Sequence, residues 1–220
     1  NKTKFDIAKQ WGEGLNIDWM LADPLLKLSE LDEQFDLIVS SPPLNMKRIS
    51  YELTNDPSGE SYQDAEEAVL IIESLHKLSQ NGEAIFILPN SFPSFNQGKR
   101  LKKFQNLGFC INAIVDIPTK YYREITSLPM SIFFISRIKT YKTFVSYLDP
   151  DKTFDDLVAD LINHKKGLKP SQGFKIDAQY YNNYELLSLQ KEIDYEISIS
   201  GAQCFDLDNI SKSIIKGSSN

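Results

Sequence analysis

The chain is poor in the residues that bind metal ions. Its 220 residues include only 2 cysteines and 2 histidines. Cys110 and Cys204 lie far apart and form no CxxC or Cys/His spacing, so the sequence predicts no metal site. His76 and His164 are isolated, and we expect both on the surfaces of helices.

The chain also lacks an apolar run long enough to span a bilayer, and its first residues contain no signal-peptide core. We therefore expect a cytoplasmic protein with no membrane partner. The net charge of −6 argues against a free-standing DNA-binding protein, which is usually basic. We interpret the one basic cluster as a solvated helix face rather than a phosphate contact. Its members are Lys99, Arg100, Lys102 and Lys103.

What the chain does contain is typical of a globular protein. Hydrophobic residues make up 41% and charged residues 25%, both ordinary shares. Strand-like and helix-like segments alternate up to about residue 137, which predicts a doubly wound α/β layer. The expected strands are residues 17–22, 35–40, 83–88, 111–117 and 130–136, and the expected helices are residues 4–11, 62–79 and 98–107.

Three of these segments carry further expectations. The strand at 35–40 is a nearly continuous apolar run, so we expect it to be buried on both faces, with a polar loop after it over roughly 45–60. The helix at 62–79 has one apolar stripe. The stripe consists of Ala65, Ala68, Val69, Ile72 and Leu75. The last two strands have no helix between them, and we expect them to form an antiparallel hairpin at one edge of the sheet.

The pattern changes after Arg137. We expect one more strand at 144–147 and a helix at 152–164. The residues from Lys165 onward have little periodicity and are interpreted as an extended tail or linker. We accordingly predict a partial α/β domain over residues 1–148 and a helix with a tail over residues 149–220.

Residues 35–44, FDLIVSSPPL, carry the clearest chemical signal. A strand of the parallel type runs into a rigid Pro-Pro turn. Ligand sites in open α/β sheets lie just outside the carboxyl ends of the strands. A simpler interpretation is that Pro42 and Pro43 only end the strand, since proline cannot continue a ladder.

A polar residue followed by Pro-Pro at this place resembles the (Asn/Asp/Ser)-Pro-Pro-aromatic motif of methyltransferases that act on amino groups. An exocyclic amine is a poor nucleophile, because its lone pair is delocalised into the ring. The resemblance implies that the first side chain and a proline carbonyl accept hydrogen bonds from this amine, while the aromatic residue stacks on a flipped base. The catalytic residues that it implies are Ser41, Pro42, Pro43 and Leu44.

The sequence downstream resembles the second half of the adenine-modifying subunits of type I restriction–modification systems. The matching segments are NGEAIFILPNSF (81–92) and KRLKKFQNLGFCINAIVDIPTKYYREITSLPMSIFFISR (99–137). Together the two segments follow the family's order. A strand ending in Leu-Pro-Asn is followed by a basic helix, a strand ending in Pro, an aromatic-containing loop and a Thr-x-x-Pro segment. The end segment DLDNISKSIIKGSSN is similar to the passage toward a target-recognition region, so the resemblance covers about residues 17–217.

The resemblance implies the C-terminal part of a Rossmann-like S-adenosylmethionine-dependent methyltransferase fold, with a mixed sheet and a terminal antiparallel hairpin. It implies S-adenosylmethionine as cofactor, with Asp23 lining the cofactor pocket, DNA as substrate, and specificity and restriction subunits as partners. Structural explanations stand beside these roles. Asp23 before Pro24 also suits a helix cap or turn, Asn90 suits a turn, and Tyr121 and Tyr122 suit a core as well as a base contact.

The family's glycine-rich cofactor loop is missing. Gly12-Glu13-Gly14 has no apolar strand before it, and Ile17 stands where a third glycine would be, so we reject it as that loop. Because the match begins near the family's third strand and the first residue is Asn, we expect a fragment of a longer protein rather than a degenerate relative. The strand at 35–40 then has an open edge, which could pair with 17–22 or with a second copy of the chain.

Three functions remain open on the sequence alone. The downstream match favours an N6-adenine DNA methyltransferase. Ser41 is typical of N4-cytosine enzymes, and related motifs methylate RNA guanine or protein glutamine. Leu44 cannot stack as an aromatic ring does, which together with Ser41 and the acidic charge favours a non-catalytic scaffold that contacts DNA or other subunits.

Overall fold

The computed structural model describes residues 2–44, 47–54, 61–95, 98–149, 151 and 153–200. The chain divides into two compact units, residues 1–181 and 182–220, and each is described by itself. The first unit contains α1 (Lys2–Trp11), α2 (Pro24–Glu30), β1 (Phe35–Ser40), β2 (Arg48–Glu52), β3 (Ser61–Ala65), α3 (Glu66–His76), β4 (Leu78–Pro89), α4 (Lys99–Asn106), β5 (Cys110–Asp116), η1 (Thr119–Tyr121), β6 (Met130–Ser136), β7 (Thr143–Tyr147), α5 (Phe154–Lys165), β8 (Phe174–Ile176) and η2 (Ala178–Tyr180).

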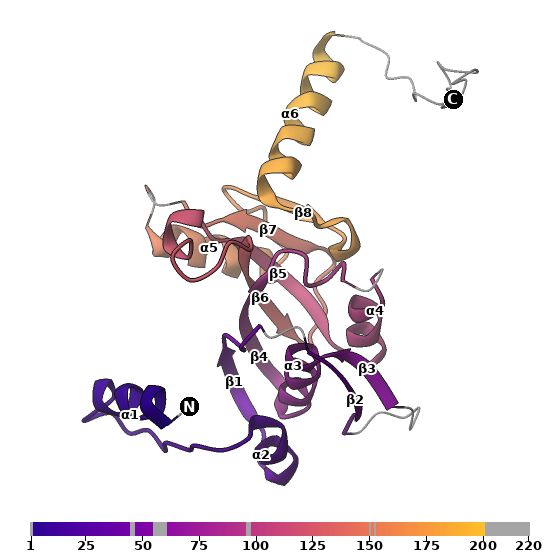
Figure 1. The fold of residues 1–220 in the computed structure, drawn as a ribbon. Helices are drawn as coiled ribbons and strands as arrows, with labels where there is room; N and C mark the ends of the chain where they lie inside the picture. The colour runs from indigo at the N-terminus through magenta and orange to yellow at the C-terminus, as the bar shows by residue number, and fades with distance from the viewer. Residues whose placement is uncertain are drawn as a thin grey trace, which may run out of the picture. The chain divides into compact units, whose positions relative to one another are not determined.

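A six-stranded mixed sheet forms the centre of the first unit, in the order β1-β4-β6-β5-β7-β8 (Figure 1). β1, β4, β5 and β7 run parallel to one another, whereas β6 and β8 run antiparallel to their neighbours. The expected α/β fold with a mixed sheet is confirmed. β5 and β6 are antiparallel as expected, but they lie in the middle of the sheet rather than at its edge, because β6 also pairs with β4 and β7 pairs with β5.

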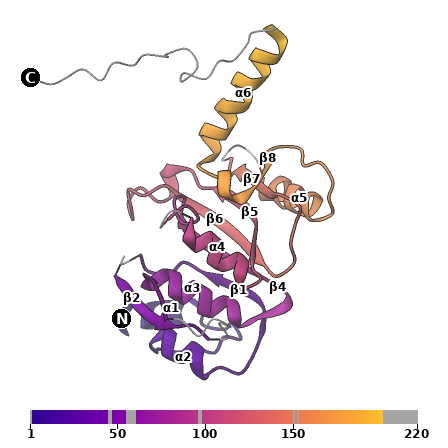
Figure 2. The same ribbon diagram turned by 90° about the vertical axis from the view of Figure 1, so that its right-hand side faces the viewer.

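Helices cover the two faces of the sheet unequally. α3 and α4 lie on one face, where Phe104 of α4 and Phe133 of β6 both pack against Phe92 (Figures 1 and 2). α5 covers the opposite face over β5 and β7, where Leu157 packs with Val115 and other apolar side chains. Fully buried apolar side chains on both faces form the core.

The apolar stripe of the predicted helix is confirmed in α3. Its five members are all buried. The helix begins at Glu66 rather than at residue 62, because Ser61–Ala65 pairs with β2 as an antiparallel hairpin. β2 also interrupts the predicted loop over 45–60, whose residues 45–46 and 55–60 lie outside the described part of the chain.

β1 confirms the strand predicted at 35–40 but not its burial. It pairs only with β4 and forms an edge of the sheet, and Leu37 and Val39 are 59% and 66% exposed. Both residues lie on the face opposite α3, next to Glu83 and Ile85 of β4, and none of the helices in the described part of the chain covers β1 there. The prediction was wrong because an apolar run shows what a strand can bury, not whether a neighbour is present to cover it.

Two further expectations were wrong. Residues 17–22 form no strand, so they do not pair with β1. Instead, the Trp19 ring packs edge-on against Phe5 of α1 and contacts Gly12, so this segment makes local contacts. The tail expected after Lys165 contains β8, η2 and, in the second unit, the 17-residue helix α6 (Tyr184–Ser200).

The sequence of α6 explains why it is helical. It contains no Gly or Pro and is rich in Leu and Glu, which favour helices, and the Asn183 side chain accepts a hydrogen bond from the Leu186 N–H at 2.8 Å as an N-cap. None of the helices in the described ranges is both long and apolar enough to cross a membrane.

Candidate functional site

The segment after β1 leaves the sheet at the carboxyl end of that strand and is not helical. Ser41 and Pro43 are exposed, Leu44 is half-buried and Pro42 is buried. The buried Pro42 ring anchors the turn, and the two prolines stop the ladder because they have no N–H to donate. The structure therefore places the Ser41 hydroxyl at the rim of the sheet and not inside a packed core.

The carboxyl ends of three parallel strands meet at this edge. Ser40, the last residue of β1, pairs with Phe86, and β4 continues to Pro89 before Asn90 leaves the strand. β5 ends at the same edge with Asp116, since it runs parallel to β4. Polar residues from separate parts of the sequence are thus collected where ligands bind in open α/β sheets.

Four of these edge residues form a connected hydrogen-bond network. Its members are Asn90, Asp116, Ser131 and Tyr181. The Ser131 Oγ lies 2.6 Å from Asn90 Oδ1 and 2.7 Å from Asp116 Oδ1. Asn90 Nδ2 donates to Asp116 Oδ2 at 3.4 Å, and the Tyr181 hydroxyl also donates to Asp116. Asn90 does lie in a turn, as expected, but its side chain also joins a buried polar network.

The network keeps Tyr181 as a hydrogen-bond donor. Burial, then the nearby Asp116 carboxylate and the hydrogen bond to it, raise the pKa of Tyr181 above its usual value. Sequence reasoning missed this residue because it is separated from Asp116 by 65 positions. The only local signal was Asp116 itself, an acidic residue at a strand end before Ile117-Pro118.

A buried ion pair fixes the segment that follows β4. Arg100 of α4 is 3% exposed and Asp64 of β3 is fully buried, and Arg100 donates to the two carboxylate oxygens at 2.7 and 3.0 Å. The guanidinium also stacks over the rings of Phe92 and Phe95, with its central carbon 4.4 and 4.7 Å from their centres. The expectation that the whole basic cluster faces solvent is therefore wrong for Arg100, because a carboxylate and two rings meet it in the interior.

The environment of Asp64 favours its charged form. Burial raises the pKa of this carboxyl group, but hydrogen bonds from Arg100, the Tyr62 hydroxyl and the Ala65 N–H outweigh burial and lower the pKa below its usual value. Burial, and then the hydrogen bond to Asp64, raise the pKa of Tyr62. Asp64 is thus an ionised acceptor surrounded by donors.

Asp23 is the N-cap of α2. Its Oδ1 accepts hydrogen bonds from the backbone N–H groups of Leu25 and Leu26 at 3.0 and 3.2 Å. Burial, and then the charges of Glu73 and Asp23, raise the pKa of Tyr51. Tyr51 of β2 therefore lies near both Glu73 of α3 and the Asp23 cap of α2. The capping role expected as the simpler explanation is present, and the role of Asp23 toward a cofactor stays a prediction.

The connection from β5 to β6 exposes apolar and aromatic side chains at the same edge of the sheet. Tyr121 is 55% exposed, and Ile125 and Leu128 are also exposed, so Tyr121 is not a core residue. Tyr122 is half-buried. The Thr126 hydroxyl accepts a hydrogen bond from the Leu128 N–H at 3.1 Å, which shapes the turn before β6.

The described residues offer only part of a cofactor site. Asp23 keeps Oδ2 for a hydroxyl donor, since both of its capping bonds use Oδ1. Gly12 does not supply a backbone cradle, because a Cβ there would lie 2.4 Å from the Trp19 ring, so its small size serves packing. Throughout the described ranges, no cluster of three or more His, Cys, Asp or Glu side chains could hold a metal ion.

A family model described as "N-6 DNA Methylase" matches residues 5–212 of this chain. Because the match covers most of the sequence, the chain belongs to that family. A comparison with curated proteins found no match.

Solved structures of type I restriction–modification proteins are among the matches. A structure of the type I restriction–modification system matches with a TM-score of 0.54 at 14% identity, over 80% of this chain and 47% of that one. The type I methyltransferase subunit from Streptococcus thermophilus matches with a TM-score of 0.46 at 16% identity, over 86% and 40%. The M protein of the EcoKI enzyme matches with a TM-score of 0.41 at 12% identity, over 57% and 28%. The chain therefore spans less than half the length of each of these proteins.

Proposed function

We propose that this chain is the part of a DNA adenine-N6 methyltransferase that holds the target base, in a protein of a restriction–modification system. The observation that carries the proposal is the non-helical Ser41–Leu44 turn at the carboxyl end of β1, with Ser41 exposed, in a member of the N-6 DNA methylase family. S-adenosylmethionine supplies the methyl group, and Asp23 is the residue of this chain proposed to contact it.

The turn suits the chemistry of a base amine. The Ser41 hydroxyl oxygen and the Pro42 carbonyl are hydrogen-bond acceptors for the two N–H groups of an exocyclic amine. Accepting those bonds draws the nitrogen lone pair out of the ring and toward an incoming methyl carbon. The N–C bond forms as the sulfur–carbon bond breaks, its electron pair stays on sulfur, and the nitrogen then loses a proton.

Tyr121 offers the aromatic surface that Leu44 cannot. It is well exposed in the β5–β6 connection, at the edge where β1 also ends. Base–aromatic stacking contributes roughly 1–3 kcal/mol per base in nucleic-acid complexes. We therefore propose that a flipped base stacks on Tyr121.

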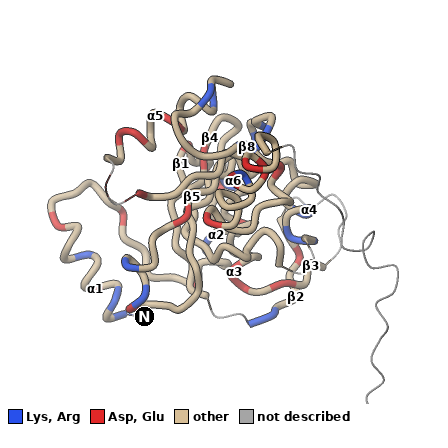
Figure 3. The backbone as a smooth tube through the Cα atoms, turned by 90° about the horizontal axis from the view of Figure 1, so that it is seen from above, with Lys and Arg blue, Asp and Glu red and all other residues tan. Residues whose placement is uncertain are grey.

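Positive charge on this chain is too dispersed to hold a DNA duplex alone. Figure 3 shows Lys and Arg positions interspersed with Asp and Glu along the backbone, and the net charge is −6. DNA affinity depends on the number of phosphates that a protein neutralises. DNA, specificity subunits and restriction subunits are therefore proposed partners that act with this chain, and the open edge of β1 is a proposed site of self-association.

Analysis of methylated bases tests the proposal. The protein that contains this chain is incubated with DNA and the methyl donor, and we expect N6-methyladenine. Ser41→Ala should lower the rate about 100-fold, the effect of removing one acceptor or donor from a reacting centre. Ser29→Ala, which removes an exposed hydroxyl in α2, should leave the rate unchanged.

Each other outcome has a definite meaning. N4-methylcytosine as the product would replace the adenine assignment with the cytosine alternative, which Ser41 favours. No methylated base would contradict catalysis by the present site. In that case a large gain of methylation in the double variant Ser41→Asn, Leu44→Phe would show a decayed site, and no gain would leave the scaffold function.

A further inference from the structure

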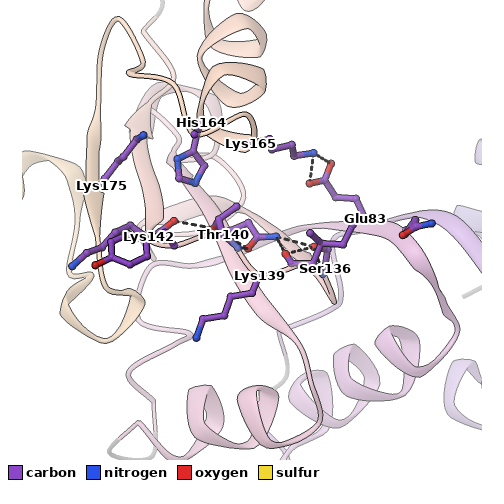
Figure 4. Close-up of a pocket in the computed structure, with 14 residues that line it drawn as sticks. Glu83, Ser136, Lys139, Thr140, Lys142, His164, Lys165 and Lys175 are labelled. Atoms are coloured by element: carbon purple, nitrogen blue, oxygen red, sulfur yellow. Dashed lines mark hydrogen bonds and ion pairs between the residues drawn. The ribbon is translucent and has the colours of Figure 1, made fainter.

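A cavity of about 470 Å³ lies at the edge of the sheet opposite Ser41. It is bordered by the start of β4, the β6–β7 connection, the end of α5 and β8 (Figure 4). Its volume falls within the range of small-molecule sites. The proposed methyl-transfer function uses none of the residues that line this cavity.

The cavity wall is basic although the chain is acidic. Four lysines line it, and Glu83 is its one carboxylate among the described residues. The lysines are Lys139, Lys142, Lys165 and Lys175. Lys165 pairs with Glu83 at 2.7 Å and Lys142 pairs with Asp177 at 3.1 Å, so these two carboxylates do not balance the charges of Lys139 and Lys175.

The structure explains the positions of some of these lysines. Lys165 lies at the carboxyl end of α5, where the helix dipole favours a cation, and Lys175 donates to the Leu168 carbonyl at 2.8 Å. The helix end supplies only about half a negative charge, which does not offset the excess. In Figure 4, the Lys139 and Lys142 side chains extend away from His164, so Lys139 must change rotamer to contact a ligand beside that ring.

His164 is the second observation. It was expected on a helix surface, but the side chain is only 5% exposed. The reason is that α5 directs it inward, where the imidazole stacks on the Phe144 ring with the two ring centres 5.5 Å apart. Figure 4 shows the ring directed from α5 into the cavity. Within the described chain neither ring nitrogen reaches a partner at hydrogen-bond geometry. A buried polar group without a well-formed hydrogen bond is destabilising, and a bound ligand that accepts or donates such a bond would offset this cost.

The pKa of His164 reports the positive field at this point. Burial, then the charge of Lys175, lower this pKa below its usual value, and Lys165 acts in the same direction. Hydrogen bonding of the ring with the backbone of Asn112 and of Lys142, which falls outside good hydrogen-bond geometry, opposes the shift in part. An anion in the cavity would reverse the effect of both lysines.

We propose that this cavity binds a phosphate-type oxyanion, with Lys139, Lys175 and His164 as the groups that hold it. The neutral imidazole has one N–H donor and the protonated ring has two, so binding of the anion favours protonation of His164. The charged groups that line the cavity or neighbour the ring are Lys139 and Lys142 from the β6–β7 connection, Lys175 of β8, Lys165 and Asp160 on its own helix, and Glu83 of β4. The oxyanion is carried either by a free nucleotide or by a nucleic-acid strand.

The two histidines of the chain allow a direct test, with His76 as an internal reference because it does not line the cavity. The Cε1–H signals of both rings are followed by NMR from pH 5 to 8 in the 220-residue chain, with and without sulfate at constant ionic strength. Sulfate is the probe because its charge does not change over this range. We expect sulfate to raise the pKa of His164 by about half a pH unit or more, and that of His76 by much less.

Lysine variants test the site itself. The double variant Lys139→Gln, Lys175→Gln should weaken sulfate binding about tenfold, because it removes two positive charges from the binding site. Both positions are exposed, so the fold should persist. Lys9→Gln, with the same type of charge change on exposed α1, should have little effect. Separate titrations with ATP and with a single-stranded oligonucleotide identify the carrier. Equal responses of the two histidines, or equal sulfate affinity in the lysine variants and Lys9→Gln, would overturn the proposal.

Discussion

The Arg100–Asp64 pair shows how a single residue pair determines local structure. The pair connects three parts of the chain, since Asp64 lies in β3, Arg100 lies in the first turn of α4, and the guanidinium covers Phe92 and Phe95 after β4. A buried ion pair is not in itself a large source of stability, because both charges lose their hydration. Removing one partner is different, since the other charge is left uncompensated.

We expect Arg100→Met to lower the free energy of unfolding by about 3–5 kcal/mol, because it leaves the Asp64 carboxylate buried without its cation. Urea unfolding followed by circular dichroism measures the change. Lys102→Met is the matched control on the exposed face of the same helix and should change stability by less than about 0.5 kcal/mol. A similarly small change in Arg100→Met would contradict the role of the pair.

The same pair gives a pH dependence with a definite sign. The pKa of Asp64 is lower in the folded chain than in the unfolded chain, so folding releases a proton near that pKa. Its contribution to stability is complete above about pH 4 and is lost as the pH falls through the lowered folded-state pKa. Asp64→Asn should therefore flatten the loss of stability between about pH 4 and pH 2.

At the scale of elements, β1 is the exposed edge of the sheet. It uses one side for β4 and leaves its other side without a partner strand, and Leu37 and Val39 stand on the uncovered face. Gly82 allows the existing contact, because a Cβ there would lie 2.9 Å from the Phe35 carbonyl oxygen. An apolar strand with an open edge is a template for pairing with another chain.

We expect copies of the chain to associate through this edge at high concentration. The substitution Val39→Lys should prevent the association, since a lysine on an edge strand disfavours pairing with another strand. Sedimentation velocity over a range of concentrations measures the effect. Ile7→Lys on exposed α1 introduces the same type of residue away from the edge and should associate like the unchanged chain. A strict monomer at high concentration would remove this proposal.

At the scale of the whole molecule, the two proposed sites lie at opposite ends of the strands of one sheet. The carboxyl edge presents Ser41 and the network around Asp116, whereas the opposite edge presents the basic cavity with His164. The described residues contain no glycine-rich turn of the kind that holds a cofactor in the family. Asp23 alone provides few contacts to a ligand of that size.

We therefore expect the 220-residue chain to bind S-adenosylmethionine with a Kd weaker than about 1 mM, equivalent to roughly −4 kcal/mol. Isothermal titration calorimetry measures it, and Asp23→Asn should weaken the residual binding further if that carboxylate contributes. Micromolar affinity in this chain would mean that a complete cofactor site exists without the glycine loop.

Local pattern was enough to determine several elements and the turn that follows β1. The apolar stripe of α3 and the Pro42-Pro43 stop after β1 are properties of neighbouring residues, so periodicity and proline chemistry predicted them. Only the tertiary structure decided that β6 lies between β4 and β5, that β1 is an exposed edge, and that Tyr181 reaches Asp116. It also decided the burial of Arg100 and His164, because burial depends on segments far away in the sequence and not on the spacing of adjacent residues.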